Sequence, residues 1–236
     1  MTDRRCRRVG HSIVKAGADL DDLAARLEGA SWDMVELDVL ARGSELLVAH
    51  SPGDLEHPHP VRFADALAAL RDLLPVGVQL DVDVKGVGYE LAVLDTLREL
   101  DLVDRTLVST MEATSLTVLR AAAPELRLGL SVPKARRDYL SHALTRPAAY
   151  AMLAYLRRVL PRRAAHAVRS GLADAIMAHW ATVTPALVAA VDTAGGELYV
   201  WTVDDAERVR SLQALGVSAV ITNDRDVFAR AGLQPT

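Results

Sequence analysis

The strongest constraint on the fold is an alternation, repeated along the whole chain, of short apolar segments with segments of helical periodicity. Such βα units are typical of a parallel sheet. The predicted strands are residues 7–11, 34–39, 78–84, 106–109, 126–130, 175–178, 198–202 and 219–222. The main helical patterns are residues 20–27, 63–74, 91–100, 115–122, 185–193 and 206–215. Eight such units in 236 residues predict an α/β fold, the compact (β/α)8 TIM barrel.

The same pattern fits a doubly wound open sheet, which is the competing architecture. We expect a basic N-terminal tail over residues 1–6 and one barrel domain over residues 7–236, because no linker rich in Ser, Gly or Pro divides the chain. Residues 133–170 are irregular, rich in Arg and Ala, and contain Pro147 and Pro161. We expect helices there that cap or flank the barrel mouth.

Charge and cysteine content restrict the partners and the compartment. The chain carries 27 Lys and Arg against 31 Asp and Glu, a net charge of −4, which by itself indicates neither a nucleic-acid nor a membrane partner. Its single cysteine, Cys6, excludes an intrachain disulfide. No apolar stretch is long enough to cross a membrane, and the basic N-terminus leads into no signal-peptide core. We therefore expect a cytoplasmic protein with a small-molecule substrate.

Acidic residues alternate with apolar ones in two neighbouring predicted strands. In MVELDV, residues 34–39, Glu36 and Asp38 share one face of the strand; in QLDVDVK, residues 79–85, Asp81, Asp83 and Lys85 share one face. In a barrel the apolar face meets the helices, so these charged side chains point inward near the carboxyl ends of the strands, where barrel active sites lie.

Converging carboxylates repel one another and need a cation between them. An all-oxygen cluster of Glu36, Asp38 and Asp83 is suited to one divalent cation, Mg²⁺ or Ca²⁺. The alternative without a metal is an internal salt-bridge network of Asp81, Asp83 and Lys85.

Histidines lie close to this cluster in the sequence. His11 ends the first strand, and His50 follows LLVAH after a hairpin-like turn at residues 42–44. Two imidazoles beside a metal suit general base and general acid catalysis of displacement at phosphorus. His179 ends the sixth predicted strand, at the rim, and we assign it no definite role from the residues alone.

The order of these motifs resembles that of the glycerophosphodiester phosphodiesterase family. The resemblance rests on GH at 10–11, VELDV at 35–39, VAH at 48–50, VDVK at 82–85, YVWTVDD at 199–205 and LGVSAVITNDRD at 215–226. It spans nearly the whole chain. The sequence is also similar to the related sphingomyelinase D type phospholipases, in which an aspartate followed two residues later by lysine is the third metal ligand.

The resemblance implies a role for each matching residue. His11 and His50 would be the acid and base pair, and Glu36, Asp38 and Asp83 would hold the metal. Lys85 would meet a phosphate oxygen, and Trp201 would line the pocket beside the non-phosphate part of the substrate. We also count His179, at the rim, among the expected substrate-binding residues.

The chain departs from the family at the residue after the first histidine. An arginine usually stands there, followed by a P-E-N-T segment, but this chain has Ser12 and IVKAGADLDD. Serine cannot replace the charge of a bidentate guanidinium on phosphate, so Ser12 alters the expected phosphate contact. Asp83 replaces the glutamate common in the phosphodiesterases, which brings the pattern nearer to the sphingomyelinase D type.

Three functions follow as hypotheses. The first is a metal-dependent phosphodiesterase that hydrolyses glycerophosphodiesters to glycerol 3-phosphate and an alcohol. The second is a phospholipase D type transphosphatidylase acting on sphingo- or lysophospholipids, and it alone requires contact with a membrane surface, through residues 148–156. The third is a non-catalytic barrel that binds phosphorylated ligands.

Overall fold

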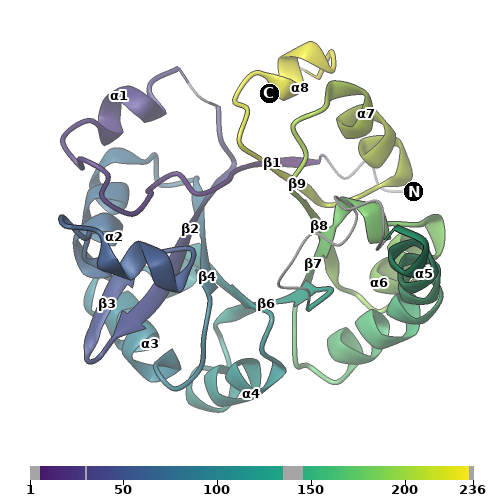
Figure 1. The fold of residues 1–236 in the computed structure, drawn as a ribbon, viewed down its shortest axis with the longest axis horizontal. Coiled ribbons are helices and arrows are strands. Elements are labelled where there is room, and N and C mark those ends of the chain that lie inside the picture. Colours follow the sequence, from purple (N-terminus) through teal and green to yellow (C-terminus); the bar gives the residue numbers. More distant parts are fainter. Residues whose placement is uncertain (1–5, 30, 135–145, 234–236) are drawn as a thin grey trace.

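Eight parallel strands close into a barrel surrounded by helices (Figure 1). The structure is a computed structural model, and it describes residues 6–29, 31–134 and 146–233. The barrel strands are β1 (Arg7–Gly10), β2 (Met34–Arg42), β4 (Gln79–Val84), β5 (Thr106–Thr110), β6 (Arg127–Val132), β7 (Ala175–His179), β8 (Glu197–Trp201) and β9 (Ala219–Thr222). Because β1 pairs with both β2 and β9, the eight parallel strands form a closed ring. The predicted (β/α)8 TIM barrel is confirmed, and the open doubly wound sheet is excluded.

A further strand, β3 (Glu45–Val48), was not among the eight predicted ones. It pairs antiparallel with the end of β2, from Val39 opposite Val48 to Arg42 opposite Glu45. Gly43 makes the turn with a φ of 63°, which glycine adopts without a Cβ clash. This hairpin, predicted at residues 42–44, returns the chain to the barrel mouth just before His50.

The helices follow the predicted pattern, and their ends have local causes. They are α1 (Leu23–Leu27), α2 (Phe63–Leu73), α3 (Glu90–Glu99), α4 (Ala113–Ala122), α5 (Arg146–Arg169), α6 (Pro185–Thr193), α7 (Ala206–Leu215) and α8 (Val227–Arg230), with short 3-10 turns η1 (Pro52–Glu56), η2 (Val103–Arg105) and η3 (Trp180–Thr182). Helix α7, for example, begins where the Asp205 side chain accepts a hydrogen bond from the Arg208 amide at 2.8 Å, and it ends at Gly216, which is left-handed.

Hydrophobic side chains pack in two layers around the strands. One layer lies between the strands and the helices, where Leu37, Val82 and Leu94 are fully buried. The other fills the barrel interior and includes Met34 on β2 and Tyr199 on β8. Because side chains alternate along a strand, the interior position of Met34 places the side chains two and four residues further on inside the barrel as well.

A polar network occupies the amino-terminal part of the barrel interior. Arg127 donates to Gln79 at 3.0 Å, to Glu197 at 2.5 Å and to the Tyr199 hydroxyl at 3.3 Å, and Arg7 pairs with Glu197. Burial raises the pKa of Tyr199 to about 12, so it stays protonated. In this fold such interactions at the amino-terminal face stabilise the barrel, whereas reactions occur at the opposite face.

The described part of the irregular stretch at residues 133–170 contains one long helix. Helix α5 has 24 residues, and Pro161 lies inside it without ending it. Proline removes one backbone donor from the helix, but Leu160 and Ala164 on either side are buried in the same core and hold this turn in place. Residues 135–145, also within the predicted insertion, lie outside the described residues.

The beginning of the chain differs slightly from the prediction. Cys6, assigned to the tail, is buried in the core directly before β1, because the chain already enters the space between the barrel and its helices at this point. Residues 1–5 lie outside the described residues. Within the described part of the chain, no helix combines the length and the apolar character that a membrane crossing requires.

Candidate active site

Three carboxylates converge at the carboxyl ends of β2 and β4. Glu36 and Asp38 lie on β2, and Asp83 lies on β4 directly opposite Asp38 in the parallel register. One oxygen from each carboxylate lies within 4.8 Å of the others, as a shared cation would require. The alternation predicted from MVELDV and QLDVDVK therefore brings the expected acids together.

The three carboxylates differ in their preferred protonation state. Burial raises the pKa of Glu36 well above its usual range, and repulsion from Asp38 raises it further. Burial also raises the pKa of Asp83, although the charge of Lys85 opposes this. For Asp38, hydrogen bonds from His50 and Lys85 outweigh burial and hold the pKa below its usual range.

Lys85 is the cation inside this cluster. Its Nζ lies 2.5 Å from Asp83 Oδ2 and 2.7 Å from Asp38 Oδ1. The expected alternative network of Asp81, Asp83 and Lys85 is thus only partly formed, because Asp38 takes the place of Asp81. Lys85 Nζ reaches outward to Asp38, which faces Asp83 across the two strands, whereas Asp81 lies one layer deeper in the barrel.

The cluster holds more acidic groups than basic ones. Asp81 is 1% exposed, its Oδ1 has no hydrogen-bond partner, and burial raises its pKa to about 8. Four acidic groups therefore have one lysine among them, and in the described part of the chain the one basic side chain in ion-pair range of Glu36 is that of His11, 3.9 Å away. A hard divalent cation fits this donor set, because all the available ligands are carboxylate oxygens and a cation between them would favour their ionised forms.

Ser12 supports the carboxylates in this structure. Its backbone N–H donates to Glu36 Oε2 at 2.6 Å, and its hydroxyl donates to Asp38 Oδ2 at 2.8 Å. Its φ of 44° is in the left-handed region, which is unfavourable for serine. The two hydrogen bonds hold this conformation and orient both carboxylates.

His50 reaches the cluster from the loop after the β2–β3 hairpin. Its Nδ1 lies 3.1 Å from Asp38 Oδ2, and this hydrogen bond raises the pKa of His50. Its backbone N–H donates to Asp54 Oδ2 at 3.0 Å, and Asp54 also accepts from Ser51. Asp54 at the start of η1 therefore fixes the backbone that carries His50.

His11 approaches from the opposite side, and its ring is oriented by a chain of hydrogen bonds. Its Nδ1 lies 2.9 Å from Asn223 Oδ1, and Asn223 Nδ2 donates to Asp204 Oδ2 at 2.9 Å. A carboxylate can only accept, so Asp204 fixes which end of the Asn223 amide faces His11. The amide oxygen then requires a proton on His11 Nδ1, which leaves Nε2 free of a proton in the neutral ring.

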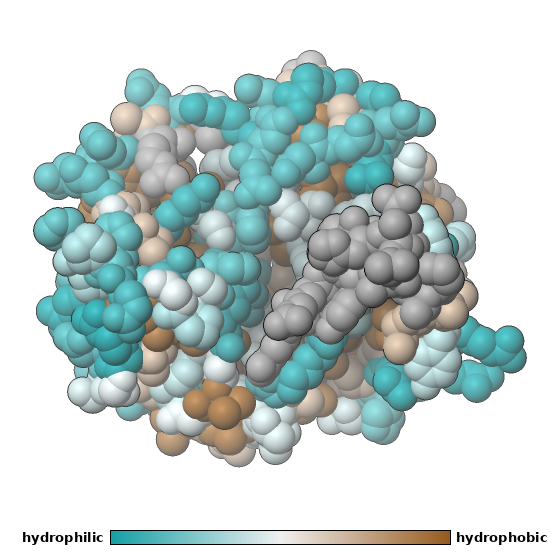
Figure 2. All heavy atoms as spheres, in the orientation of Figure 1, coloured by the Kyte–Doolittle hydropathy of each residue, from teal (hydrophilic) through white to brown (hydrophobic). Residues whose placement is uncertain are grey.

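Both histidines open onto one cleft of about 480 Å³. Its lining includes His11, His50 and Asp38 as well as Ser12 and Lys15. Hydrophilic side chains surround the central hollow on this face of the molecule (Figure 2).

Gly17 shapes the loop that forms one wall of the cleft. Its φ is 69°, and a Cβ there would lie 2.1 Å from the His57 ring. The loop after β1 can therefore approach the loop after β3 closely only with glycine at this position.

Trp201 and His179 lie together at the ends of β8 and β7. Their rings meet edge to face with centroids 5.1 Å apart, and Trp201 Nε1 donates to the Met177 carbonyl at 2.9 Å. His179 Nδ1 accepts from the Ala181 amide at 3.3 Å at the start of η3. These bonds anchor both side chains, and neither residue is in the lining of the cleft that holds the two histidines.

Sequence reasoning did not assign roles to Asn223, Asp204, Asp54 or Lys15. Asp204 and Asn223 lie within the motifs YVWTVDD and LGVSAVITNDRD, but nothing in their spacing shows that they contact His11. Lys15 lines the cleft, and its side chain has no ion-pair partner within the part of the chain that the structure describes.

Solved structures share this fold. A glycerophosphodiester phosphodiesterase from Parabacteroides distasonis has a TM-score of 0.72 at 13% identity, covering 96% of this chain and 98% of that one. One from Agrobacterium tumefaciens has a TM-score of 0.66 at 18% identity, covering 96% and 100%. A phosphodiesterase from Oleispira antarctica, solved in complex with the product sn-glycerol-3-phosphate, has a TM-score of 0.66 at 16% identity, covering 96% of both chains.

Comparison with curated proteins finds no match to this chain. The model of the glycerophosphoryl diester phosphodiesterase family matches residues 73–227, which is more than half of the chain and includes Asp83, Trp201 and Asn223. The segment before it, with both histidines and the β2 carboxylates, lies outside the match and completes the site in space. The chain therefore belongs to the glycerophosphoryl diester phosphodiesterase family, and it is a phosphoric diester hydrolase.

Proposed function

We propose that this protein hydrolyses glycerophosphodiesters to glycerol 3-phosphate and an alcohol by metal-dependent, two-histidine acid and base catalysis. The observation that carries the proposal is the meeting of His11 and His50, from separate loops, at one carboxylate cluster in one cleft. Membership of the family and the glycerol 3-phosphate bound to the Oleispira antarctica phosphodiesterase support the substrate class.

The two histidines have different environments, which supports different roles. His11 Nε2 is the unprotonated nitrogen of a ring held by Asn223, so His11 is suited to accept a proton. The hydrogen bond that His50 donates to Asp38 raises the pKa of His50, so His50 keeps its proton to higher pH and is suited to donate one. We assign His11 as the base and His50 as the acid.

In this scheme the substrate supplies its own nucleophile, as the family resemblance implies. His11 takes the proton from the glycerol 2-hydroxyl, whose oxygen attacks phosphorus, and His50 protonates the departing alcohol oxygen. The products of this step are a cyclic phosphate and the free alcohol. The histidines then exchange roles, and water opens the cyclic phosphate to glycerol 3-phosphate.

Glu36, Asp38 and Asp83 would hold one divalent cation, Mg²⁺ or Ca²⁺. The bound ion would act as a Lewis acid on a phosphoryl oxygen. Ser12 keeps two of the carboxylates oriented through its amide and hydroxyl, and Lys85 limits the repulsion between Asp38 and Asp83.

The phosphate needs cationic contacts that Ser12 cannot supply. Lys85 is shared between two carboxylates, whereas the exposed Lys15 lines the cleft three residues after Ser12 and is unpaired among the described residues. We assign Lys15 as a contact to the anionic phosphate, with Lys85 as a second contact. Trp201 and His179 remain proposed contacts to the rest of the substrate, because they lie at the same end of the barrel.

One observation favours the lipid-acting alternative. Tyr150, Met152 and Tyr155 on α5 are exposed apolar or amphipathic side chains, as a lipid substrate would require near the site. In that case the same histidines would release a cyclic lipid phosphate.

The single cysteine, which is buried, supports a reducing compartment, so we propose a cytoplasmic location.

Hydrolysis of glycerophosphocholine and of lysophosphatidylcholine, followed by phosphorus NMR, tests these functions. We expect release of glycerol 3-phosphate from the soluble diester, loss of turnover with EDTA, and recovery with Mg²⁺ or Ca²⁺. Turnover of the lipid alone, to a cyclic phosphate, would establish the alternative.

The matched control is His11→Ala, which removes the base but leaves all three carboxylates. It should lower kcat by about 10²–10⁴-fold while calorimetry finds unchanged affinity for the cation. Near-normal turnover by this variant would refute the two-histidine scheme.

A further inference from the structure

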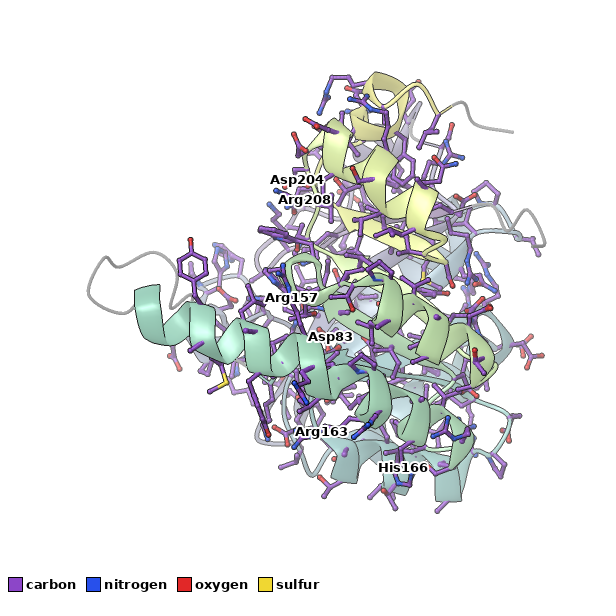
Figure 3. All side chains as sticks on the ribbon, turned by 90° about the vertical axis from the view of Figure 1, so that its right-hand side faces the viewer. Asp83, Arg157, Arg163, His166, Asp204 and Arg208 are labelled. Carbon is purple, nitrogen blue, oxygen red and sulfur yellow. The ribbon has the colours of Figure 1, made fainter. Side chains whose placement is uncertain are left out.

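Helix α5 extends beyond the barrel on the side of the active site. It has 24 residues and is about 36 Å long, whereas the adjoining strands β6 and β7 have six and five residues and are about 20 and 17 Å long. It follows β6, so its first half stands at the carboxyl ends of the strands. Figure 3 shows this half projecting to the left, past the rest of the barrel.

The two halves of α5 differ in burial. The second half is attached to the core through Leu160, Ala164, Ala165 and Ala167. Between residues 150 and 159 no side chain is buried. Instead Tyr150, Met152 and Tyr155, which we call the α5 tip, are 62%, 56% and 52% exposed. Met152 and Tyr155 are three positions apart and share one face of the helix, whereas Tyr150 lies on a different face. Large exposed side chains within two turns of one helix favour a binding surface.

The charge of α5 is opposite in sign to that of the whole protein. Residues 150–169 contain five arginines and no Asp or Glu, although the chain has a net charge of −4. Arg157 donates to the Ala181 carbonyl at 2.9 Å. Arg158, Arg162 and Arg163 are exposed and have no carboxylate partner among the described residues. We call these three the α5 arginines.

We propose that the α5 tip and the α5 arginines dock this protein on an anionic lipid surface. Tyrosine and methionine insert into the interfacial region of a bilayer, and arginines beside them bind anionic head groups. This inference deepens the proposed function and rests on it, since docking by a helix beside the barrel mouth would bring the histidine cleft close to the lipid surface.

Other occupants fit these observations less well. A nucleic acid would match the arginines but would leave the apolar tip without a role. A second copy of the chain, paired about a two-fold axis, would place the α5 arginines of both copies near one another. A lipid surface with anionic head groups satisfies both the apolar and the cationic residues.

The test is cosedimentation of the full chain with vesicles of phosphatidylcholine alone and with 30% phosphatidylglycerol (about this fraction gives a strongly negative surface). We expect binding that is about tenfold or more stronger to the anionic vesicles and that weakens with salt. The variant Arg158→Gln/Arg162→Gln/Arg163→Gln should bind anionic vesicles about a hundredfold more weakly, because each arginine near such a surface contributes roughly fivefold. Tyr150→Ser/Met152→Ser/Tyr155→Ser should also lose binding.

The matched control is Val76→Ser/Val118→Ser, which removes two exposed apolar side chains from other parts of the surface and should bind as the wild type does. Equal binding to both vesicle types, absence of binding, or wild-type binding by the tip variant would overturn the proposal. The proposal would also be overturned if the wild type formed a dimer that the tip variant loses, while the tip variant still bound the vesicles.

Turnover of glycerophosphocholine separates this proposal from the proposed function. The tip and arginine variants should hydrolyse the soluble diester as the wild type does. Intact turnover without vesicle binding would refute docking alone, and vesicle binding without turnover by the wild type would refute the proposed function alone.

Discussion

The hydrogen-bond chain from Asp204 through Asn223 to His11 allows a quantitative prediction. Asn223→Ala removes the acceptor that holds the proton on His11 Nδ1, 2.9 Å away. A neutral hydrogen bond of this kind stabilises the oriented His11 ring by about 1 kcal/mol. Without it the ring gains conformational freedom, and ordering the ring again for the reaction costs roughly a further 0.5 kcal/mol of conformational entropy. The sum of about 1.5 kcal/mol corresponds to an approximately tenfold lower kcat. KM should change less than twofold, because Asn223 contacts the histidine and holds no substrate charge.

Steady-state kinetics at saturating Mg²⁺ or Ca²⁺ measures the decrease in kcat. A double-mutant cycle tests whether Asp204 acts on His11 through Asn223. Asp204→Ala should lower kcat less than Asn223→Ala does, because the freed amide still presents its oxygen to His11 part of the time. The double variant should be no slower than Asn223→Ala, since the two residues act in series.

NMR supplies a readout that a purely structural role would not change. The imidazole nitrogen shifts of His11 report whether the proton is on Nδ1, and Asn223, the only asparagine in the sequence, can be labelled selectively. A wild-type kcat for Asn223→Ala, or additive losses in the double variant, would refute the argument.

Three further predictions concern other parts of the molecule. Lys15→Gln should raise KM for the diester about fivefold with kcat nearly unchanged, and Lys15→Arg should restore it; an unchanged KM would rule out the phosphate contact. Burial raises the pKa of the Cys6 thiol to about 12, so the folded protein should resist alkylation at pH 8 and react only after unfolding. Because the folded pKa lies above the unfolded one, this thiol stabilises the fold below about pH 9 and its contribution falls as pH rises towards 12, which denaturation at several pH values would measure. Leu94→Ala empties a fully buried position and should lower the free energy of unfolding by about 2–5 kcal/mol in urea titrations; a smaller loss would mean that α3 closes the cavity.

The inward position of the carboxylates could be predicted because strand geometry is local. Glu36 and Asp38 alternate with Val35 and Leu37, and once these residues form a barrel strand, the two faces are determined. The same reasoning placed Asp83 beside them, and the register of β2 and β4 agrees with it. Lys85 was predicted on the correct face, but its choice of Asp38 over Asp81 depends on the relative depth of side chains on two strands.

Other features were not predictable from local patterns. Pro161 lies inside α5 without ending it, because packing of Leu160 and Ala164 against the core holds the helix together. Ser12 was expected only as a lost phosphate contact, and the structure shows its hydroxyl on a carboxylate that lies 26 residues away in the sequence.

The sequence by itself determined the βα repeat and the chemical character of the mouth, because alternation and helical periodicity act over a few residues. Closure of the strands into a barrel was decided by the pairing of β1 with both β2 and β9. Only the tertiary structure decided how His11 is held, because Asn223 lies 212 residues away and meets it only when β9 closes the barrel against β1. It also decided that no described side chain of α5 before Leu160 is fully buried, although Leu156 packs against the core, since a long helix beside short strands must extend past them. Contacts of this kind depend on where the closed barrel brings distant segments together, which no local spacing encodes.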